Sequence, residues 1–185
     1  MRIIAGSRKG TRIVAPPGRA TRPTADRVRE AAFNLVGPVE GARVLDLYAG
    51  SGAMGLEALS RGAAHVVIVD GDRRAVEAIR RNVEKLGLPG AEVVHGEAAS
   101  RLVADARSGN EYDLVLIDPP YRMTSQSLKA LAPQLPSLLA PGALVVVETE
   151  EREHPELPLA VRTSRRYGSS RITLFEAPDP EPDGA

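Results

Sequence analysis

Residues 43–55 read RVLDLYAGSGAMG and carry the strongest structural signal in the chain. The apolar run at 43–48 predicts a buried strand, and the glycines that follow it predict a tight loop that opens a helix at 53–61. A second strand is expected at 65–70, and its last residue, Asp70, lies 20 residues after Gly50. Strand, glycine loop, helix and acid-ended strand in this order are typical of an α/β domain with a parallel sheet.

The alternation of strands and helices continues to the end of the domain. A helix capped by Asp72 is predicted to run to Gly87, and the remaining patterns predict strands at 92–95, 112–117 and 143–148, helices at 98–107 and around 128–138, and final strands at 161–167 and 171–176. Pro133 and Pro136 should divide the helix around 128–138. Since no helix separates the final strands, we expect an antiparallel hairpin that turns at Gly168 and Ser169, and so a mostly parallel seven-stranded sheet.

Composition limits the chemistry that the chain can perform. Its 185 residues, 43% of them hydrophobic, suit one domain with one core. The absence of cysteine excludes disulfides, thiolate zinc sites and a cysteine nucleophile. His65, His95 and His154 have no metal-ligand spacing, so no metal is expected. Neither a long apolar run nor a signal-peptide pattern is present, and we expect a soluble, cytoplasmic monomer.

The formal net charge of zero conceals a basic amino terminus, because residues 1–30 hold eight basic and two acidic side chains. We expect a basic arm or hairpin at 1–22, a domain at 23–177 that begins with a helix capped by Thr24, and an acidic disordered tail at 178–185. Such an arm suits a polyanion, although a merely solvated basic segment would read the same way. The candidate RNA-binding residues are Arg2, Arg8, Lys9, Arg12, Arg22, Arg27 and Arg29.

The glycine loop predicts a cofactor site that two classes of enzyme could use. Glycines allow close backbone approach, the helix amino terminus faces the ligand, and Asp70 can accept hydrogen bonds from ribose hydroxyls, as in NAD-binding oxidoreductases. Asp46 favours a different ligand, because a carboxylate beside the loop repels a pyrophosphate and attracts the cationic end of S-adenosylmethionine. The candidate cofactor-binding residues here are Asp46, Tyr48, Ala49, Gly50, Ser51, Gly52 and Asp70.

A second candidate site follows the expected strand at 112–117 and consists of Asp118, Pro119, Pro120 and Tyr121. An exocyclic amino group is a poor nucleophile, since its lone pair is delocalised into the ring. The Asp118 carboxylate and the Pro119 carbonyl could each accept one of its N–H groups, and Tyr121 could stack on the base. The structural alternative is a proline turn in which Asp118 is only a cap. These four residues are the catalytic candidates.

The two motifs together resemble class I methyltransferases that methylate amino groups, and the chain is more closely similar to the RsmD family of bacterial 16S rRNA (guanine(966)-N2)-methyltransferases. The similarity covers 2–6, 9–10, 22–24, 26–30, 33–34, 46–63, 118–121 and 167–168. It implies a Rossmann-like fold, S-adenosylmethionine as cofactor, and methyl transfer to N2 of a guanine in 16S rRNA on a partly assembled small subunit. It also implies that Gly96, Glu97 and Ala98 lie near the adenine, although Glu97 stands where many relatives have Asp or Asn.

Three alternatives remain open at the level of sequence. An N6-adenine or N4-cytosine DNA methyltransferase would use the same amino-group chemistry. An NAD-binding oxidoreductase would use the same glycine loop, but Asp46 and Asp118 argue against it. A ribosome assembly factor could keep the fold without turnover, against which the intact Asp118 to Tyr121 motif argues.

Overall fold

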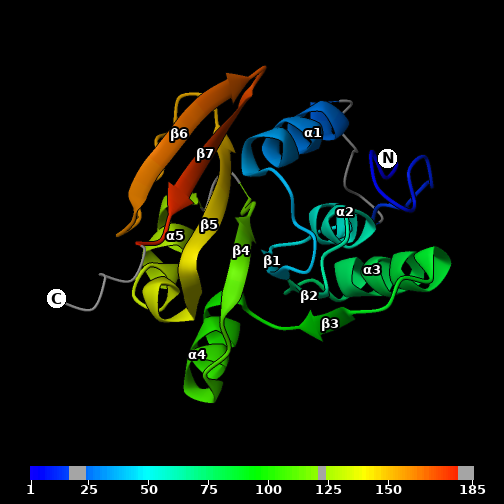
Figure 1. Ribbon diagram of the computed structural model, residues 1–185, viewed down its shortest axis with the longest axis horizontal. Coiled ribbons are helices and arrows are strands. Elements are labelled where there is room, and N and C mark those ends of the chain that lie inside the picture. Colours follow the sequence, from blue (N-terminus) through cyan, green and yellow to red (C-terminus); the bar gives the residue numbers. More distant parts are fainter. Residues whose placement is uncertain (17–23, 121–123, 179–185) are drawn as a thin grey trace, which may run out of the picture.

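The computed structural model describes residues 1–16, 24–120 and 124–178 and contains a seven-stranded sheet in the order β3-β2-β1-β4-β5-β7-β6 (Figure 1). Its strands are β1 (Arg43–Leu47), β2 (His65–Asp70), β3 (Ala91–His95), β4 (Tyr112–Ile117), β5 (Leu139–Glu150), β6 (Ala160–Tyr167) and β7 (Ser170–Glu176). Strands β1 to β5 are parallel, and β7 is antiparallel to both of its neighbours. The predicted sheet and its terminal hairpin are confirmed.

Helices cover both faces of the sheet. The elements are α1 (Thr24–Val36), α2 (Ala53–Ser60), α3 (Arg73–Leu86), α4 (Ala98–Ser108), α5 (Thr124–Leu131) and a 3-10 helix, η2 (Leu135–Leu138). Apolar residues of α1, α2 and α3 form one buried cluster against the sheet, and those of α4, α5 and η2 form another on the opposite face. Because both faces are covered, the central strands are apolar at nearly every position. Among the described residues, no helix has the length and apolar character needed to span a membrane.

The predicted boundaries hold to within a few residues except in β5. As expected from the prolines, α5 ends at Leu131 and the 3-10 helix begins only at Leu135. Strand β5, however, begins at Leu139 and includes Pro141 and Gly142, whereas the sequence predicted a strand that starts at residue 143. A register shift between Tyr112 and Leu114 on β4 accommodates these residues. Proline is tolerated in a strand where pairing is irregular, and here the extra residues of the irregularity lie in β5, between Leu139 and Leu144.

The amino-terminal segment, residues 1–16, is more closely integrated with the domain than the predicted basic arm suggested. A bridge between Arg2 and Arg12 makes the expected short hairpin. Ile3 and Ile13 are buried in the same cluster as residues of α1 and α2. Glu57, fully buried on α2, accepts hydrogen bonds from the Ile4 and Ala5 amides at 2.8 and 2.9 Å. The hairpin is therefore part of the core.

Candidate active site

The glycine loop is shaped by backbone geometry at the carboxyl end of β1. The Gly52 amide donates to the Ala49 carbonyl at 2.8 Å, which closes the turn directly before α2. Gly52 has a φ of 76°, and Tyr48 has a φ of 61°, an unusual value for a residue with a side chain. Gly52 makes no side-chain cap on α2. That amides at the start of α2 face a bound ligand stays a prediction, and one of them, at Gly55, donates to Asp46 instead.

Asp46 holds α2 against the sheet. It is only 2% exposed, and its Oδ2 accepts a hydrogen bond from the Gly55 amide at 2.8 Å. A Cβ at residue 55 would lie 3.0 Å from this oxygen and 3.0 Å from Val66 Cγ1, so glycine avoids a crowded contact here. Burial raises the pKa of Asp46 to about 7, against the effect of the Gly55 hydrogen bond. The negative charge of Asp70 raises it further. A cation bound nearby would favour the ionised form.

Asp70 is buried at the end of β2, with its carboxylate fixed by two backbone amides. Its Oδ2 accepts from Gly50 at 2.7 Å, and its Oδ1 accepts from Asp72 at 2.8 Å. Each carboxylate oxygen has further lone-pair capacity, so these contacts orient the group and still allow it to accept hydroxyl protons. This arrangement is compatible with the predicted ribose contact.

Asn82, which the sequence analysis missed, supports the glycine loop through a hydrogen bond to its backbone. This α3 residue is 1% exposed, and its Nδ2 donates to the carbonyls of Ser51 and Val14, both at 2.9 Å. Its Oδ1 accepts from the Val14 amide at 2.8 Å. One side chain thus joins the amino-terminal segment to the cofactor loop. The available signal was a polar residue three positions after Ile79, on the apolar face of the helix.

Residues 96–98, which the resemblance places near the adenine, follow β3 beside the end of β2. The Gly96 amide donates to the Asp70 carbonyl at 3.1 Å, and exposed Glu97 precedes the first residue of α4. The pKa of Tyr48 is raised above its usual value, mainly because the side chain is partly buried. A hydrogen bond with Ser127 lowers the pKa, and the negative charge of Glu97 raises it. Tyr48 therefore connects the end of β1 with α5 and with the region of Glu97.

The turn after β4 leaves the sheet beside the cofactor loop. Parallel pairing aligns Leu47 of β1 with Ile117 of β4, so Tyr48 and Asp118 follow at the same level on adjacent strands. Adjacent strands lie about 4.8 Å apart. Asp118 and Pro120 are exposed, whereas Pro119 is buried. Tyr121 lies outside the described residues. The fold therefore brings two motifs about 70 residues apart in sequence to one edge of the sheet, where strand order reverses.

Most of the candidate RNA-binding residues are exposed, but Arg29 is not. Arg2, Arg8, Lys9, Arg12 and Arg27 are at the surface, and Arg22 lies outside the described residues. Arg29 is 3% exposed, and its guanidinium donates to the Arg2 carbonyl and to Asp26 and lies 3.5 Å from Glu57. The prediction of a phosphate contact for Arg29 is therefore wrong. Its position four residues before buried Phe33 turns it inward, where it anchors the amino-terminal segment.

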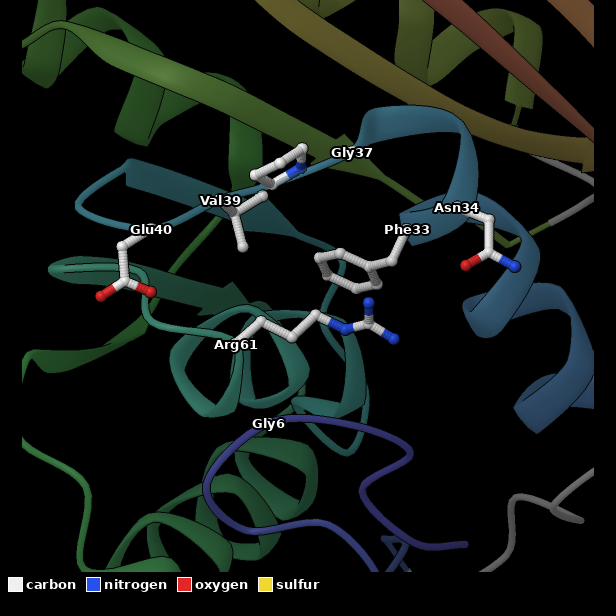
Figure 2. Close-up of a pocket in the computed structure, with 8 residues that line it drawn as sticks. Gly6, Phe33, Asn34, Gly37, Val39, Glu40 and Arg61 are labelled. Atoms are coloured by element: carbon white, nitrogen blue, oxygen red, sulfur yellow. The ribbon is translucent and has the colours of Figure 1, made fainter.

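A cavity of about 480 Å³ lies elsewhere, at the amino-terminal edge of the sheet. Its lining comes from the loop at Gly6, the end of α1 and the segments that precede β1 and follow α2. Figure 2 shows the Arg61 side chain extending toward Phe33, and the guanidinium lies 4.7 Å from the ring centroid. Arg61 also donates to Glu57 at 2.8 Å. Its polar groups are committed to the core, and the cavity lies at the edge opposite the two motifs, so we do not assign the reaction to it.

Comparison with known proteins places the chain among RNA methyltransferases. A family model described as "Conserved hypothetical protein 95" matches residues 1–176. Ribosomal RNA small subunit methyltransferase D of Escherichia coli (strain K12) is 39% identical over 162 residues, which cover 85% of this chain and 79% of that protein. The same-named protein of Haemophilus influenzae is 33% identical over 82% of this chain and 79% of its own length.

Solved structures agree with the sequence comparison. A hypothetical protein of Thermus thermophilus has a TM-score of 0.82 and 33% identity, with 96% of this chain and 99% of that chain covered. TrmN from the same organism has a TM-score of 0.67 and 26% identity, covering 81% of this chain and 48% of that one. The resemblance and the fold class inferred from the sequence are confirmed.

Proposed function

This chain belongs to the conserved hypothetical protein 95 family and is a homologue of ribosomal RNA small subunit methyltransferase D, and on that premise we propose that it methylates the exocyclic N2 of a guanine in 16S rRNA, of the guanine 966 type, with S-adenosylmethionine as donor. The substrate is proposed to be the small ribosomal subunit or its assembly intermediate, and the enzyme a monomer without metal. The observation that carries the proposal is the adjacency of the glycine loop after β1 and the Asp118 turn after β4.

The residues around the loop suit S-adenosylmethionine better than a dinucleotide. Asp70 is held where ribose hydroxyls could donate to it, and the region of Gly96, Glu97 and Ala98 is assigned to the adenine. Asp46 places a buried carboxyl group under the loop, where the amino-acid end of the cofactor carries positive charge. A pyrophosphate in the same place would meet the buried carboxyl group of Asp46 and would be repelled by its ionised form.

The chain's own contribution to methyl transfer is to orient the amino group and exclude other geometries. Asp118 and the Pro119 carbonyl accept the two N–H groups of N2, which directs its lone pair at the sulfonium methyl. When bound, S-adenosylmethionine would supply the methyl group and keep the C–S electron pair on sulfur, and the methylated N2 would lose one proton to solvent. While the charge on nitrogen develops, the Asp118 carboxylate stabilises it. Tyr121 is proposed to stack on the base after it leaves the RNA stack.

Arginine and lysine side chains near the amino terminus are proposed to bind the RNA backbone. The described members of the set are Arg2, Arg8, Lys9, Arg12 and Arg27, all exposed, and Arg22 completes it. They attract phosphates without reading sequence, so they would position the small-subunit RNA, and the identity of the base would depend on the pocket around Asp118.

Two measurements test the proposal. Calorimetric titration should detect S-adenosylmethionine binding and no NAD binding, and the reverse result would assign the chain to the oxidoreductases. Mass spectrometry of nucleosides should then find N2-methylguanosine in small-subunit RNA after treatment of particles from a deletion strain. Methylated adenine or cytosine in DNA would support the DNA methyltransferase alternative. Particle binding without any methylated product would support an assembly factor.

A further inference from the structure

The hairpin of β6 and β7 places two arginines directly opposite each other. Arg166 of β6 pairs in register with Arg171 of β7, beside the turn at 168–169. Directly opposed residues of an antiparallel pair project from the same face, and like charges in this arrangement destabilise the sheet. Arginine on an edge strand such as β6 can protect against edge-to-edge aggregation. That explanation does not cover Arg171, because β7 lies between β5 and β6 and is not an edge strand.

Neither guanidinium is neutralised by an acidic side chain within the described part of the chain. Arg171 donates only to neutral oxygens, the Glu151 carbonyl and Ser164 Oγ, each at 3.0 Å. These contacts fix its direction and leave its charge unpaired. Arg166 is exposed, and none of the ion pairs among described residues includes it. The nearby Glu151 carboxylate lies 3.7 Å from Arg152 instead.

The pair stands at the same edge of the sheet as the Asp118 turn. Ile117 is in register with Val147 of β5, and Arg171 is in register with Thr149, so Arg171 lies one residue beyond the level of Asp118. Strand β5 lies between β4 and β7 (Figure 1). At about 4.8 Å per strand, Arg171 is about 10 Å from β4 in the plane of the sheet, and Arg166 about 15 Å. Those distances suit the backbone of an RNA segment whose base enters the site.

We propose that Arg166 and Arg171 form a phosphate-binding pair that holds the RNA backbone next to the target nucleotide, an inference that rests on the proposed function. A phosphate between the two guanidinium groups would replace their repulsion with charge-assisted hydrogen bonds, and the planar fork of arginine suits its oxygens. The pair would supply a second contact to RNA, separate from that of the amino-terminal residues. It lies on β6 and β7, the last two strands in the order of the sheet, whereas the amino-terminal segment packs against α1 and α2.

The test compares Arg166→Ala with Arg162→Ala in the full-length chain. Arg162 is exposed on the same strand but lies 3.4 Å from Glu176, at the end of the hairpin remote from Asp118. Binding to small-subunit particles, or to a 16S rRNA fragment that the wild type methylates, would be measured from low to high salt. We expect Arg166→Ala to weaken binding about 5- to 10-fold and to lower the salt slope by about one, while Arg162→Ala changes neither. S-adenosylmethionine affinity should be unchanged in both variants.

Stability measurements separate this role from a structural one. Loss of a structural contact would lower the melting temperature of Arg166→Ala, whereas relief of like-charge repulsion should leave it unchanged or raise it. Wild-type RNA affinity and salt slope in Arg166→Ala, or an equal loss in Arg162→Ala, would overturn the inference while methylation by the wild type still stood. Failure of the wild type to bind S-adenosylmethionine or to methylate would instead reject the proposed function.

Discussion

The glycine loop after β1 and the proline turn after β4 leave the same edge of the sheet, yet their carboxyl groups occupy opposite environments. Asp46 and Asp70 are buried and accept hydrogen bonds from backbone amides of the loop and of α2. Asp118 is exposed at the start of its turn. A buried group that holds the backbone supports the structure, and on the proposed function it also binds the cofactor, so its replacement should affect stability and cofactor binding together. Asp118 is exposed, so its replacement should disturb the core less than replacement of Asp46 or Asp70 and should act mainly on the reaction.

The largest effect is expected for Asp118, the exposed carboxyl group. Replacing Asp118 with Ala removes a group that stabilises charge on the target nitrogen, and kcat should fall roughly 100- to 1,000-fold, about 3 to 4 kcal/mol. Single-turnover methyl transfer to small-subunit particles measures the loss, and cofactor affinity and melting temperature should stay near wild type. Glu111→Ala, at an exposed acid directly before β4 and at the opposite end of the strand, is the matched control. Near-normal turnover by Asp118→Ala would reduce the turn to a strand terminator.

Asp70→Ala, at a buried carboxyl group, should weaken cofactor binding and also lower stability. Loss of a carboxylate that accepts from ribose should weaken S-adenosylmethionine binding by on the order of 2 kcal/mol, about 30-fold. The amides of Gly50 and Asp72 would lose their acceptor as well, so the melting temperature should also fall. Calorimetry and thermal denaturation measure the two effects. Unchanged cofactor affinity in a destabilised variant would show that Asp70 only supports the loop.

Asp46 should give the cofactor site a pH dependence. Because its folded-state pKa is raised from 3.8 to about 7, the folded chain binds more protons than the unfolded chain between these values, and wild-type stability should fall as pH rises through this window. Asp46→Asn should remove that dependence. If the cationic cofactor needs the ionised form, affinity should rise about tenfold from pH 6 to pH 8, with proton release on binding. Titration in buffers of different ionisation enthalpy detects the release, and Asp72→Asn, an exposed cap, should behave like wild type.

The smallest expected effect tests whether the buried network extends to the amino terminus. Asn82→Ala removes the hydrogen bond to the Ser51 carbonyl and should weaken cofactor binding about fivefold, about 1 kcal/mol. Val14→Ala changes only an exposed side chain and keeps the backbone bonds to Asn82, so it should leave cofactor affinity at the wild-type value. Wild-type affinity in Asn82→Ala would show that the loop keeps its shape without this support.

The sequence was sufficient for features whose signal is local. The glycine loop, the Asp72 cap, the end of α3 at Gly87 and the hairpin turn at 168–169 each depend on residues a few positions apart. Asn82 was missed and Arg29 was assigned to RNA, since, apart from Asp26 beside Arg29, their hydrogen-bond partners lie 27 to 68 residues away. Both residues share helix faces with buried side chains, so the helical periodicity could have predicted that they are buried. The periodicity could not predict the partner of each residue, a backbone carbonyl from the amino-terminal segment.

By itself, the sequence determined the order of strands and helices, the family, and the two motifs, because hydrophobic period, glycine positions and acidic residues act over short distances along the chain. The tertiary structure decided which motifs meet, which charges face solvent and which are used inside. It placed Asp118 beside the cofactor loop through parallel pairing of β1 with β4, and it turned Arg29 inward while leaving Arg166 opposite Arg171 at the surface. Strand pairing and burial bring together residues that are distant in sequence. The distribution of charge along the chain does not show which residues these are.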